Sequence, residues 1–341
     1  MRIADYRGDA TIRTIVDREK GQYLGHPTTA LLKDGKTILC VYPLAHGRGA
    51  IQYKKSFDGG RTWSERLPVP ESFKTSLECP TIYRVTDKKL LLFSGMYPAR
   101  IAKSYDEGMT WTELEPIGDF GGIVFASDLY RKRDGALLAV FHDDGGYIAS
   151  EPIASGFVVY GILSRDDGET WSDPFPLVSH PDADLCEPCI IPSFDGSKLL
   201  MLLRENSRKH NSFVCESDDD GATWHSLREL PLSLTGDRHT AKQMHNGDLF
   251  ISFRDMANGS PTNGSWVAWV GSFEDILEGR DGKLRLLLME NHYSWGDCAY
   301  PGVEVLPEGT VVTTTYGHWI EGEEPFIVSI RLSESEIQAL Y

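Results

Sequence analysis

One octapeptide recurs four times along the chain, and it constrains the fold more than any other feature of the sequence. The copies share the pattern Ser-x-Asp-x-Gly-x-Thr-Trp and occupy residues 56–63, 104–111, 164–171 and 217–224. In this pattern the Asp caps turn amides, the Gly supplies a positive φ, and the Trp fills the apolar gap beside the turn. The starts lie 48, 60 and 53 residues apart. This spacing suits one four-stranded sheet per repeat.

A second repeat marks six β-hairpins. In each, an extended segment leads to a short turn that is followed by an apolar run. The turns are Asp34-Gly35, Asp87-Lys88, Asp134-Gly135, Asp195-Gly196, Asn246-Gly247 and Glu308-Gly309. Six such hairpins predict an all-β, six-bladed β-propeller that forms a single domain over residues 1–341. We expect residues 10–16 to supply the outer strand of the last blade and residues 334–341 to form a short helix.

The octapeptide matches the Asp-box (BNR repeat) of the sialidase, or neuraminidase, superfamily, and the chain resembles bacterial exo-α-sialidases over nearly its whole length. The resemblance implies a sialidase-like propeller with four Asp-boxes, and it places these boxes on the face opposite the active site. Two stacked β-sandwich domains are the alternative fold. That fold predicts a linker, and no stretch rich in Pro, Gly or Ser divides the chain.

Charge and composition restrict the partners. The net charge is −16, which argues against nucleic acid, because a nucleic-acid partner needs a broad basic face. No run of 18 apolar residues exists, so we expect no membrane span. The first nine residues carry no apolar stretch typical of a secretory signal, which leaves the cytoplasm, or secretion after loss of a leader, as the compartment.

The six cysteines favour free, buried thiols over a metal site. They are scattered along the chain at positions 40, 79, 186, 189, 215 and 298. Cys186 and Cys189 fit C-x-x-C, but they lack a second ligand pair for zinc, and residues three apart in a strand face opposite sides. We therefore expect neither a metal nor a cofactor.

Propeller topology selects the residues that face one funnel, because the first strand of each hairpin starts at the mouth and the second returns to it. Counting back eight residues from each turn gives His26, Cys79, Ala126, Glu187, Arg238 and Tyr300. The second strands end at Tyr42, Gly95, His142, Arg204, Arg254 and Tyr316. Three arginines near one axis would repel each other unless an anion or a carboxylate lies among them. Bidentate guanidinium groups suit a substrate carboxylate.

The resemblance assigns roles to several of these positions. Sialidases use a tyrosine nucleophile activated by a glutamate, and these correspond to Tyr300 and Glu187; the arginine that follows the glutamate corresponds to Arg204. Arg238 and Arg254 are candidates for the rest of an arginine triad. We expect Arg204, Arg238 and Arg254 to converge around the substrate carboxylate, and the Tyr300 hydroxyl to lie within hydrogen-bond reach of Glu187.

Blade one departs from the family pattern. The family usually opens this blade with Arg-Ile-Pro, whereas this chain has Gly25-His26-Pro27, and the loop that should carry the acid/base aspartate contains His46 and Arg48 instead. Histidine can protonate a leaving group near neutral pH, so His46 is the first candidate for the acid. Asp143 or Asp144 is the second. His26, Arg48 and Tyr316 are expected to contact the sugar.

These observations predict a retaining exo-α-sialidase-like glycoside hydrolase that removes terminal sialic acid from sialylated glycans or free sialosides. Two alternatives remain open. One is a propeller glycosidase or lyase that acts on another acidic sugar, such as a uronate or Kdo. The other is a non-catalytic glycan-binding propeller, which would have no need of a Tyr–Glu pair at the mouth.

Overall fold

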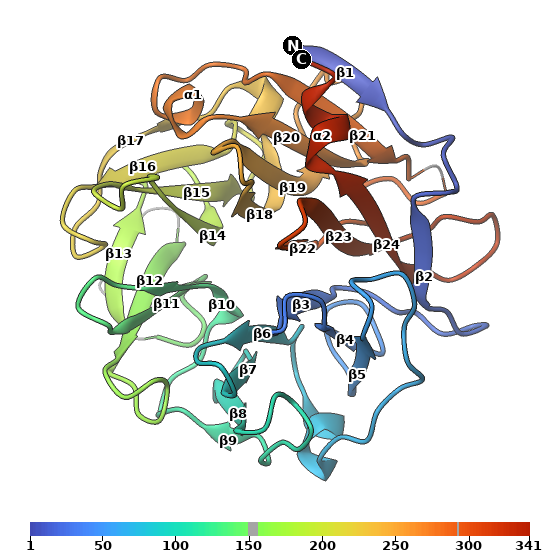
Figure 1. Ribbon diagram of the computed structural model, residues 1–341. Coiled ribbons are helices and arrows are strands. Elements are labelled where there is room, and N and C mark those ends of the chain that lie inside the picture. The colour runs from blue at the N-terminus through green and yellow to red at the C-terminus, as the bar shows by residue number, and fades with distance from the viewer. Residues whose placement is uncertain (149–155, 292) are drawn as a thin grey trace.

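The six hairpins form the inner halves of six β-sheets that stand in a ring around one axis (Figure 1). The structure is a computed structural model, and it describes residues 1–148, 156–291 and 293–341. The first strand of each hairpin lies nearest the axis, so the six-bladed propeller expected from the sequence is confirmed.

The first three blades follow one another along the chain. Blade 1 has three strands, β3 (Thr28–Leu31), β4 (Ile38–Pro43) and β5 (Ile51–Ser56). Blade 2 has four strands, β6 (Thr81–Arg84), β7 (Leu90–Ser94), β8 (Arg100–Ser104) and β9 (Glu115–Pro116). Blade 3 consists of β10 (Ile123–Arg131), β11 (Leu137–Asp143), β12 (Val158–Ser164) and β13 (Phe175–Ser179).

Two of the remaining blades also take strands from the N-terminus. Blade 4 consists of β14 (Leu185–Pro192), β15 (Leu199–Glu205), β16 (Phe213–Ser217) and β17 (His225–Glu229). Blade 5 consists of β18 (Gly236–Gln243), β19 (Leu249–Asp255), β20 (Trp266–Gly271), β21 (Leu284–Met289) and β1 (Arg2–Asp5). Blade 6 consists of β22 (Gly302–Val305), β23 (Thr310–Gly317), β24 (Phe326–Ser333) and β2 (Arg13–Asp17).

The N-terminal strands close the ring. Strand β2 pairs antiparallel with β24, as expected for the outer strand of the last blade. Strand β1 adds a fifth strand to blade 5, parallel to β21, which the sequence did not predict. The N- and C-termini lie side by side at the rim (Figure 1), where the Arg2 guanidinium donates to the carbonyl of Leu340.

Helices are short. They are the 3-10 turns Glu71–Thr75 and Leu232–Leu234, and the helices α1 (Phe273–Leu277) and α2 (Glu334–Gln338). Helix α2 agrees with the helix expected at residues 334–341. Within the described ranges no helix is long and apolar enough to cross a membrane.

Apolar side chains between neighbouring sheets hold the ring together. Leu91 and Phe93 of blade 2, for example, pack against Phe125 and Phe141 of blade 3, and similar clusters fill the other seams. Each fully buried Leu or Phe contributes about 1.5–3 kcal/mol, so these seams dominate the stability of the ring. The apolar runs after each turn supply these residues because central blade strands are covered on both faces.

The four Asp-boxes have one geometry. The hydroxyl of the Thr donates to the Asp carboxylate at 2.6 Å in every copy. In the first copy Gly60 N–H donates to Ser56 Oγ at 2.7 Å, and Gly59 N–H reaches the hairpin carbonyl of Lys36 at 2.9 Å. The boxes therefore lie beside the hairpin turns, on the face opposite the mouth, and they stabilise the blades.

Candidate active site

Five inner strands enter the ring through a residue with left-handed backbone. His26, Ala126, Glu187, Arg238 and Ala299 have φ between 49° and 55°. A non-glycine residue in this region costs about 1–3 kcal/mol, and such residues concentrate at functional sites. In blades 3, 4 and 5 a register shift between the first two strands occurs at the same place. In blade 6 the residue with positive φ is Ala299. It directly precedes Tyr300, the residue found by counting back eight positions from the turn.

Tyr300, Glu187 and Arg204 form a hydrogen-bonded trio at the mouth. The Tyr300 hydroxyl donates to Glu187 Oε1, so the contact expected from the sequence is present. Arg204 Nη1 donates to the same oxygen at 2.7 Å and to the Tyr300 hydroxyl at 3.1 Å. Glu187 Oε2 is buried and accepts no hydrogen bond from any described residue. That oxygen is therefore available to an incoming group.

The electrostatics of the trio favour a neutral phenol beside an ionised carboxylate. Burial, reinforced by the charge of Glu187, raises the pKa of Tyr300 well above its ordinary value. Burial also opposes ionisation of Glu187, but the Arg204 guanidinium, the hydrogen bond from Tyr300 and the charge of Arg238 together hold the pKa of that carboxyl below its usual range. Tyr300 thus carries the proton and Glu187 is ready to accept it.

A buried carboxylate, Asp237, neutralises the arginine cluster. Arg254 binds it through Nε at 3.0 Å and Nη2 at 2.5 Å, and Arg208 through Nη1 at 2.6 Å and Nη2 at 2.7 Å. Arg204 Nε lies 3.2 Å from Asp237 Oδ1. Burial alone would raise the pKa of Asp237, but Arg254, Arg204 and Arg208 hold it far below the ordinary range. The protein itself supplies the carboxylate that converging arginines require.

Arg238, the third arginine of the expected triad, does not bind Asp237. Its side chain lines a cavity of about 460 Å3 around the axis below the mouth, next to Tyr83 and Asp128. The residue is 5% exposed, and no described carboxylate forms an ion pair with it. The strand-terminal Arg204 and Arg254, by contrast, lie against Asp237. Burial opposes the charge of Arg238, but neighbouring Tyr83, Glu187 and Asp128 raise the pKa of its guanidinium, which stays ionised.

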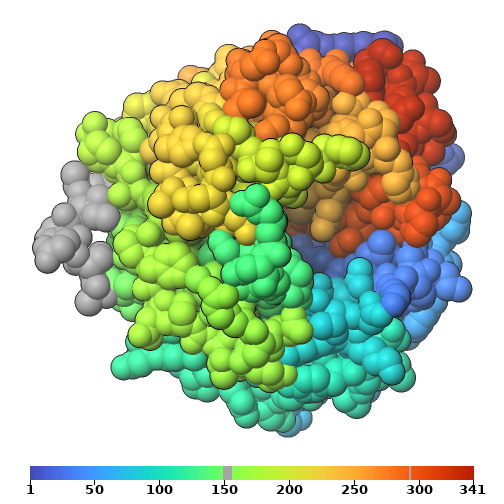
Figure 2. Space-filling model, turned by 60° about the vertical axis from the view of Figure 1, so that its left-hand side comes forward, coloured from blue at the N-terminus to red at the C-terminus, as the bar shows by residue number. Residues whose placement is uncertain are grey.

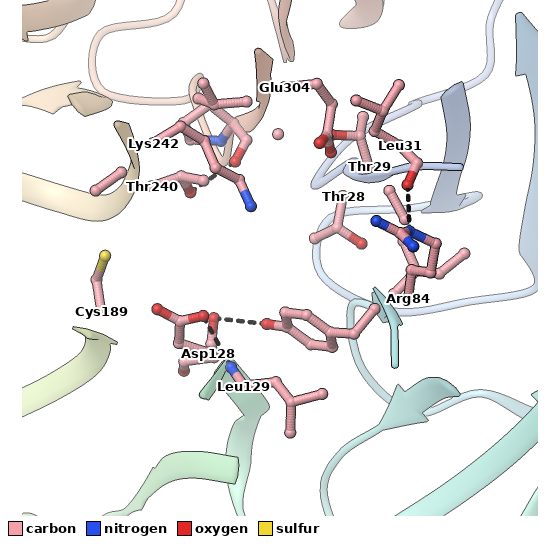
Figure 3. Close-up of a pocket in the computed structure, with 18 of the residues that line it drawn as sticks. Thr28, Thr29, Leu31, Arg84, Asp128, Leu129, Cys189, Thr240, Lys242 and Glu304 are labelled. Carbon is pink, nitrogen blue, oxygen red and sulfur yellow. Dashed lines mark hydrogen bonds between the residues drawn. The ribbon is translucent and has the colours of Figure 1, made fainter. Parts of the chain in front are cut away.

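The axial cavity carries charge of both signs. Lys242 and Thr28 reach into it from opposite sides, and Asp128 and Glu304 line its edge (Figure 3). Thr29 Oγ1 donates to Glu304 at 2.8 Å, and the Ile190 N–H donates to Asp128 at 2.8 Å. Burial raises the pKa of both carboxyls.

A second network at the mouth centres on Asp297. Tyr23 donates its hydroxyl proton to Asp297 Oδ1 at 2.8 Å and lies 2.7 Å from His46 Nδ1. His318 Nε2 lies 2.8 Å from Asp297 Oδ2. Burial opposes ionisation of Asp297, but the hydrogen bonds from His46, His318 and Tyr23 hold its pKa well below the usual range. Tyr23 bridges His46 to this carboxylate, and His46 itself is exposed, with 65% of its side chain accessible.

His26 and Tyr316 form the wall between the two networks. The His26 ring stacks on Tyr316 at 4.6 Å between centroids and meets Tyr300 edge-on at 4.5 Å. Gly47 N–H donates to His26 Nδ1 at 3.1 Å, which leaves the proton on Nε2, 3.2 Å from the Tyr316 hydroxyl. Burial lowers the pKa of His26 well below its ordinary value, so the ring is neutral.

Two other expected residues lie outside these networks. Asp143 is buried, and its carboxylate accepts the backbone N–H groups of Tyr147 at 3.1 Å and Ile148 at 3.0 Å. Asp143 therefore holds a turn, and this placement argues against it as the proton donor. Arg48 is exposed on the same loop as His46.

Sequence reasoning missed Asp237, Arg208, Asp297 and Tyr23. Only one residue per strand end was counted, and all four lie beside a counted position or on a loop. The signal that could have found Asp237 is its place directly before Arg238.

Among the described residues, no group of three or more His, Cys, Asp or Glu side chains could hold a metal ion.

The space-filling view shows a depression near the middle of the ring, bordered by segments of blade 1 in blue, blade 2 in cyan, blade 3 in green and blades 5 and 6 in orange to red (Figure 2).

Comparisons with known proteins agree with the Asp-box reading. Residues 50–297 match the profile of the BNR repeat-like domain. No match was found among curated proteins. A solved structure of a protein of unknown function from Dyadobacter fermentans is 15% identical, with a TM-score of 0.74; the alignment covers 95% of this chain and 98% of that one.

Two sialidases share the fold. The Hadza microbial sialidase Hz136 is 17% identical with a TM-score of 0.65, and the alignment covers 92% of this chain and 66% of that one. The NanB sialidase from Streptococcus pneumoniae is 13% identical with a TM-score of 0.67, and the alignment covers 96% of this chain and 71% of that one. At these identities the likeness shows a common propeller.

Proposed function

This chain belongs to the BNR repeat-like family, and we propose that it is a retaining glycoside hydrolase of the sialidase type that removes terminal sialic acid from glycans. The observation that carries the proposal is the trio at the mouth, in which Tyr300 is hydrogen-bonded to Glu187 and both are bonded to Arg204. A glycan-binding protein gains nothing from a neutral phenol directed at an ionised carboxylate.

A tyrosine nucleophile suits a sugar that carries a carboxylate at its anomeric carbon. That carboxylate would repel a carboxylate nucleophile, whereas a phenol stays neutral until it attacks. In the first step Tyr300 Oη bonds to the anomeric carbon while its proton passes to Glu187. The bond to the leaving oxygen breaks, and His46 supplies the proton that this oxygen needs.

In the second step water replaces Tyr300. His46, now neutral, accepts a proton from the water as its oxygen attacks the anomeric carbon, and Tyr300 leaves with the proton held by Glu187. The sugar keeps its configuration because two displacements occur. Tyr23 and Asp297 hold His46 in place, because its Nδ1 lies 2.7 Å from the Tyr23 hydroxyl and 3.4 Å from Asp297 Oδ1.

We assign recognition of the substrate carboxylate to Arg238 and Arg204. Arg238 is the buried guanidinium without an ion pair, and Arg204 already spans Glu187 and Tyr300. Arg254 supports them, because it is bound to Asp237 and to the carbonyl of Cys298. His26, Tyr316 and Arg48 would border the sugar.

A panel of fluorogenic glycosides, sialosides first, tests the proposal, with Tyr300→Phe as the matched inactive variant. A fluorinated sialoside should form a covalent adduct on Tyr300 that peptide mass spectrometry locates. Hydrolysis by the variant at the wild-type rate, or an adduct on another residue, would refute the mechanism.

One second candidate is favoured by blade 1, where histidines stand in place of the family's arginine and aspartate. With His26 and His46 at the mouth, the same propeller could act on another acidic sugar, a uronate or Kdo. Uronate and Kdo glycosides in the panel distinguish the two candidates.

A further inference from the structure

The axial cavity below the mouth extends to the opposite face of the ring. Its volume of about 460 Å3 lies within the range of about 300–1,000 Å3 typical of small-molecule sites. Arg84 and Gln243 line it, both are exposed, and each lies three residues before a hairpin turn. The hairpin turns lie beside the Asp-boxes, so this end of the cavity reaches the Asp-box face. A ligand can therefore enter the cavity without passing through the mouth.

Two carboxyl groups in the cavity have no cation within ion-pair distance among the described residues. The Ile190 N–H donates to Asp128 at 2.8 Å, and Thr29 Oγ1 donates to Glu304 at 2.8 Å, so both side chains are held in place. Burial raises the pKa of both carboxyls, and the charge of Lys242 opposes this rise without cancelling it. The carboxyls are thus only partly compensated, and a cationic group of a ligand would stabilise their ionised form.

Lys242 supplies the opposite charge. Its ammonium group bonds no other residue in the part of the chain that the structure describes. Figure 3 shows this group directed into the open space that Asp128 and Glu304 border. A ligand with only a positive charge would be repelled by Lys242, and one with only a negative charge would be repelled by the two carboxylates. A ligand that carries both charges matches the lining.

The neutral hydroxyl groups of the cavity already donate to the backbone. Thr28 Oγ1 donates to the carbonyl of Pro80 at 3.1 Å, and Thr240 Oγ1 donates to the carbonyl of Pro301 at 2.7 Å. The charged side chains therefore dominate recognition of a ligand.

We propose that the axial cavity binds a small zwitterion, a primary amine that also carries a carboxylate, as free amino acids do. Its ammonium group would lie at Asp128 and Glu304 and its carboxylate at Lys242, where charge-assisted hydrogen bonds form on both sides. This site goes beyond the proposed function, because it uses neither Tyr300 nor Glu187 and is reached from the Asp-box face. The ligand and a glycoside at the mouth should bind at the same time.

Isothermal titration calorimetry tests the proposal with a series of ω-amino acids from glycine to aminohexanoate. Butyrate and butylammonium serve as analogues that carry one charge each. At least one member of the series should bind about ten- to a hundredfold more tightly than either analogue, since a hydrogen bond to a charged group contributes about this factor. An analogue that binds as tightly as the best member, or a series without any binding member, would overturn the zwitterion site.

Variants of the lining locate the binding. Lys242→Met and Asp128→Asn should each weaken the best zwitterion about ten- to a hundredfold while circular dichroism stays unchanged. Lys36→Met is the matched control, because Lys36 is exposed on the hairpin of blade 1 and does not line the cavity. It should bind the zwitterion as the wild type does. The Lys242 side chain is exposed at the end of its strand, so its variant should fold, and undiminished binding by Lys242→Met would overturn the site.

One further variant separates this site from the mouth. Tyr300→Phe should bind the zwitterion as tightly as the wild type, and loss of binding in this variant would place the ligand at the mouth and overturn the axial site. None of these titrations requires that the protein cleave a sialoside, so the zwitterion site and the proposed function can fail separately.

Discussion

Replacement of Asp237 by Asn should destabilise the protein strongly, because the carboxylate compensates a buried group of arginines. The Asp237 side chain is 0% exposed, and those of Arg254 and Arg204 are 9% and 15% exposed. Removal of one partner of a buried ion pair costs about 3–5 kcal/mol, because the remaining charge is left uncompensated. The Arg208 side chain is 37% exposed, so water screens its ion pair with Asp237. That pair contributes about 1 kcal/mol or less to the unfolding free energy.

We therefore expect Asp237→Asn to lose about 3–5 kcal/mol of unfolding free energy. At about 2 °C per kcal/mol, the low end for large domains, Tm should fall by about 6–10 °C. Urea unfolding followed by tryptophan fluorescence measures the loss. Asp134→Asn is the matched control, since Asp134 pairs with Arg165 at 3.0 Å on an exposed surface. A loss under about 1 kcal/mol for Asp237→Asn would refute the role of Asp237 as counter-ion.

The pH dependence gives an independent check of the same reasoning. The pKa of Asp237 is lowered in the folded state, so its stabilisation is complete above the unfolded value of about 3.9. It is lost as the pH falls through the lower folded value. The stability difference between wild type and Asp237→Asn should therefore be constant from pH 5 to 8 and shrink in more acidic solution. A difference that grows on acidification contradicts this assignment.

Three further predictions concern the mouth and the Asp-boxes. Tyr300→Phe should lower kcat for sialosides by several orders of magnitude while circular dichroism and Tm stay close to wild type; an unchanged kcat excludes Tyr300 as nucleophile. His46→Ala should slow a natural sialoside by about 10²–10⁴-fold but a nitrophenyl sialoside much less, and equal losses would remove His46 as the acid. The hydrogen bond from Thr170 lowers the pKa of Asp166 to about 2, so the stability difference between wild type and Asp166→Asn should decrease between pH 4 and pH 2, and urea unfolding at stepped pH measures it.

Local chemistry made the architecture predictable from the sequence. The hydrogen bonds between Ser, Asp, Gly and Thr in each Asp-box join residues within its own eight, and each hairpin turn is specified by an Asp-Gly-like pair beside apolar strands. The height of a residue in the ring then follows from its distance to the turn, because a strand rises by a constant step per residue. For this reason counting alone placed Glu187 and Tyr300 at the mouth, where they share a hydrogen bond.

The charges around that pair were decided by the tertiary structure. Arg238 lines the axial cavity while Arg254 binds Asp237, and the loop that carries Asp297 brings this carboxylate to His46 across the gap between blades 6 and 1. Loops of unequal length carry no period from which such contacts can be counted. Whether converging arginines are neutralised by a substrate or by the protein's own Asp237 depends on which side chains fill the buried space between them, and only the folded ring defines that space.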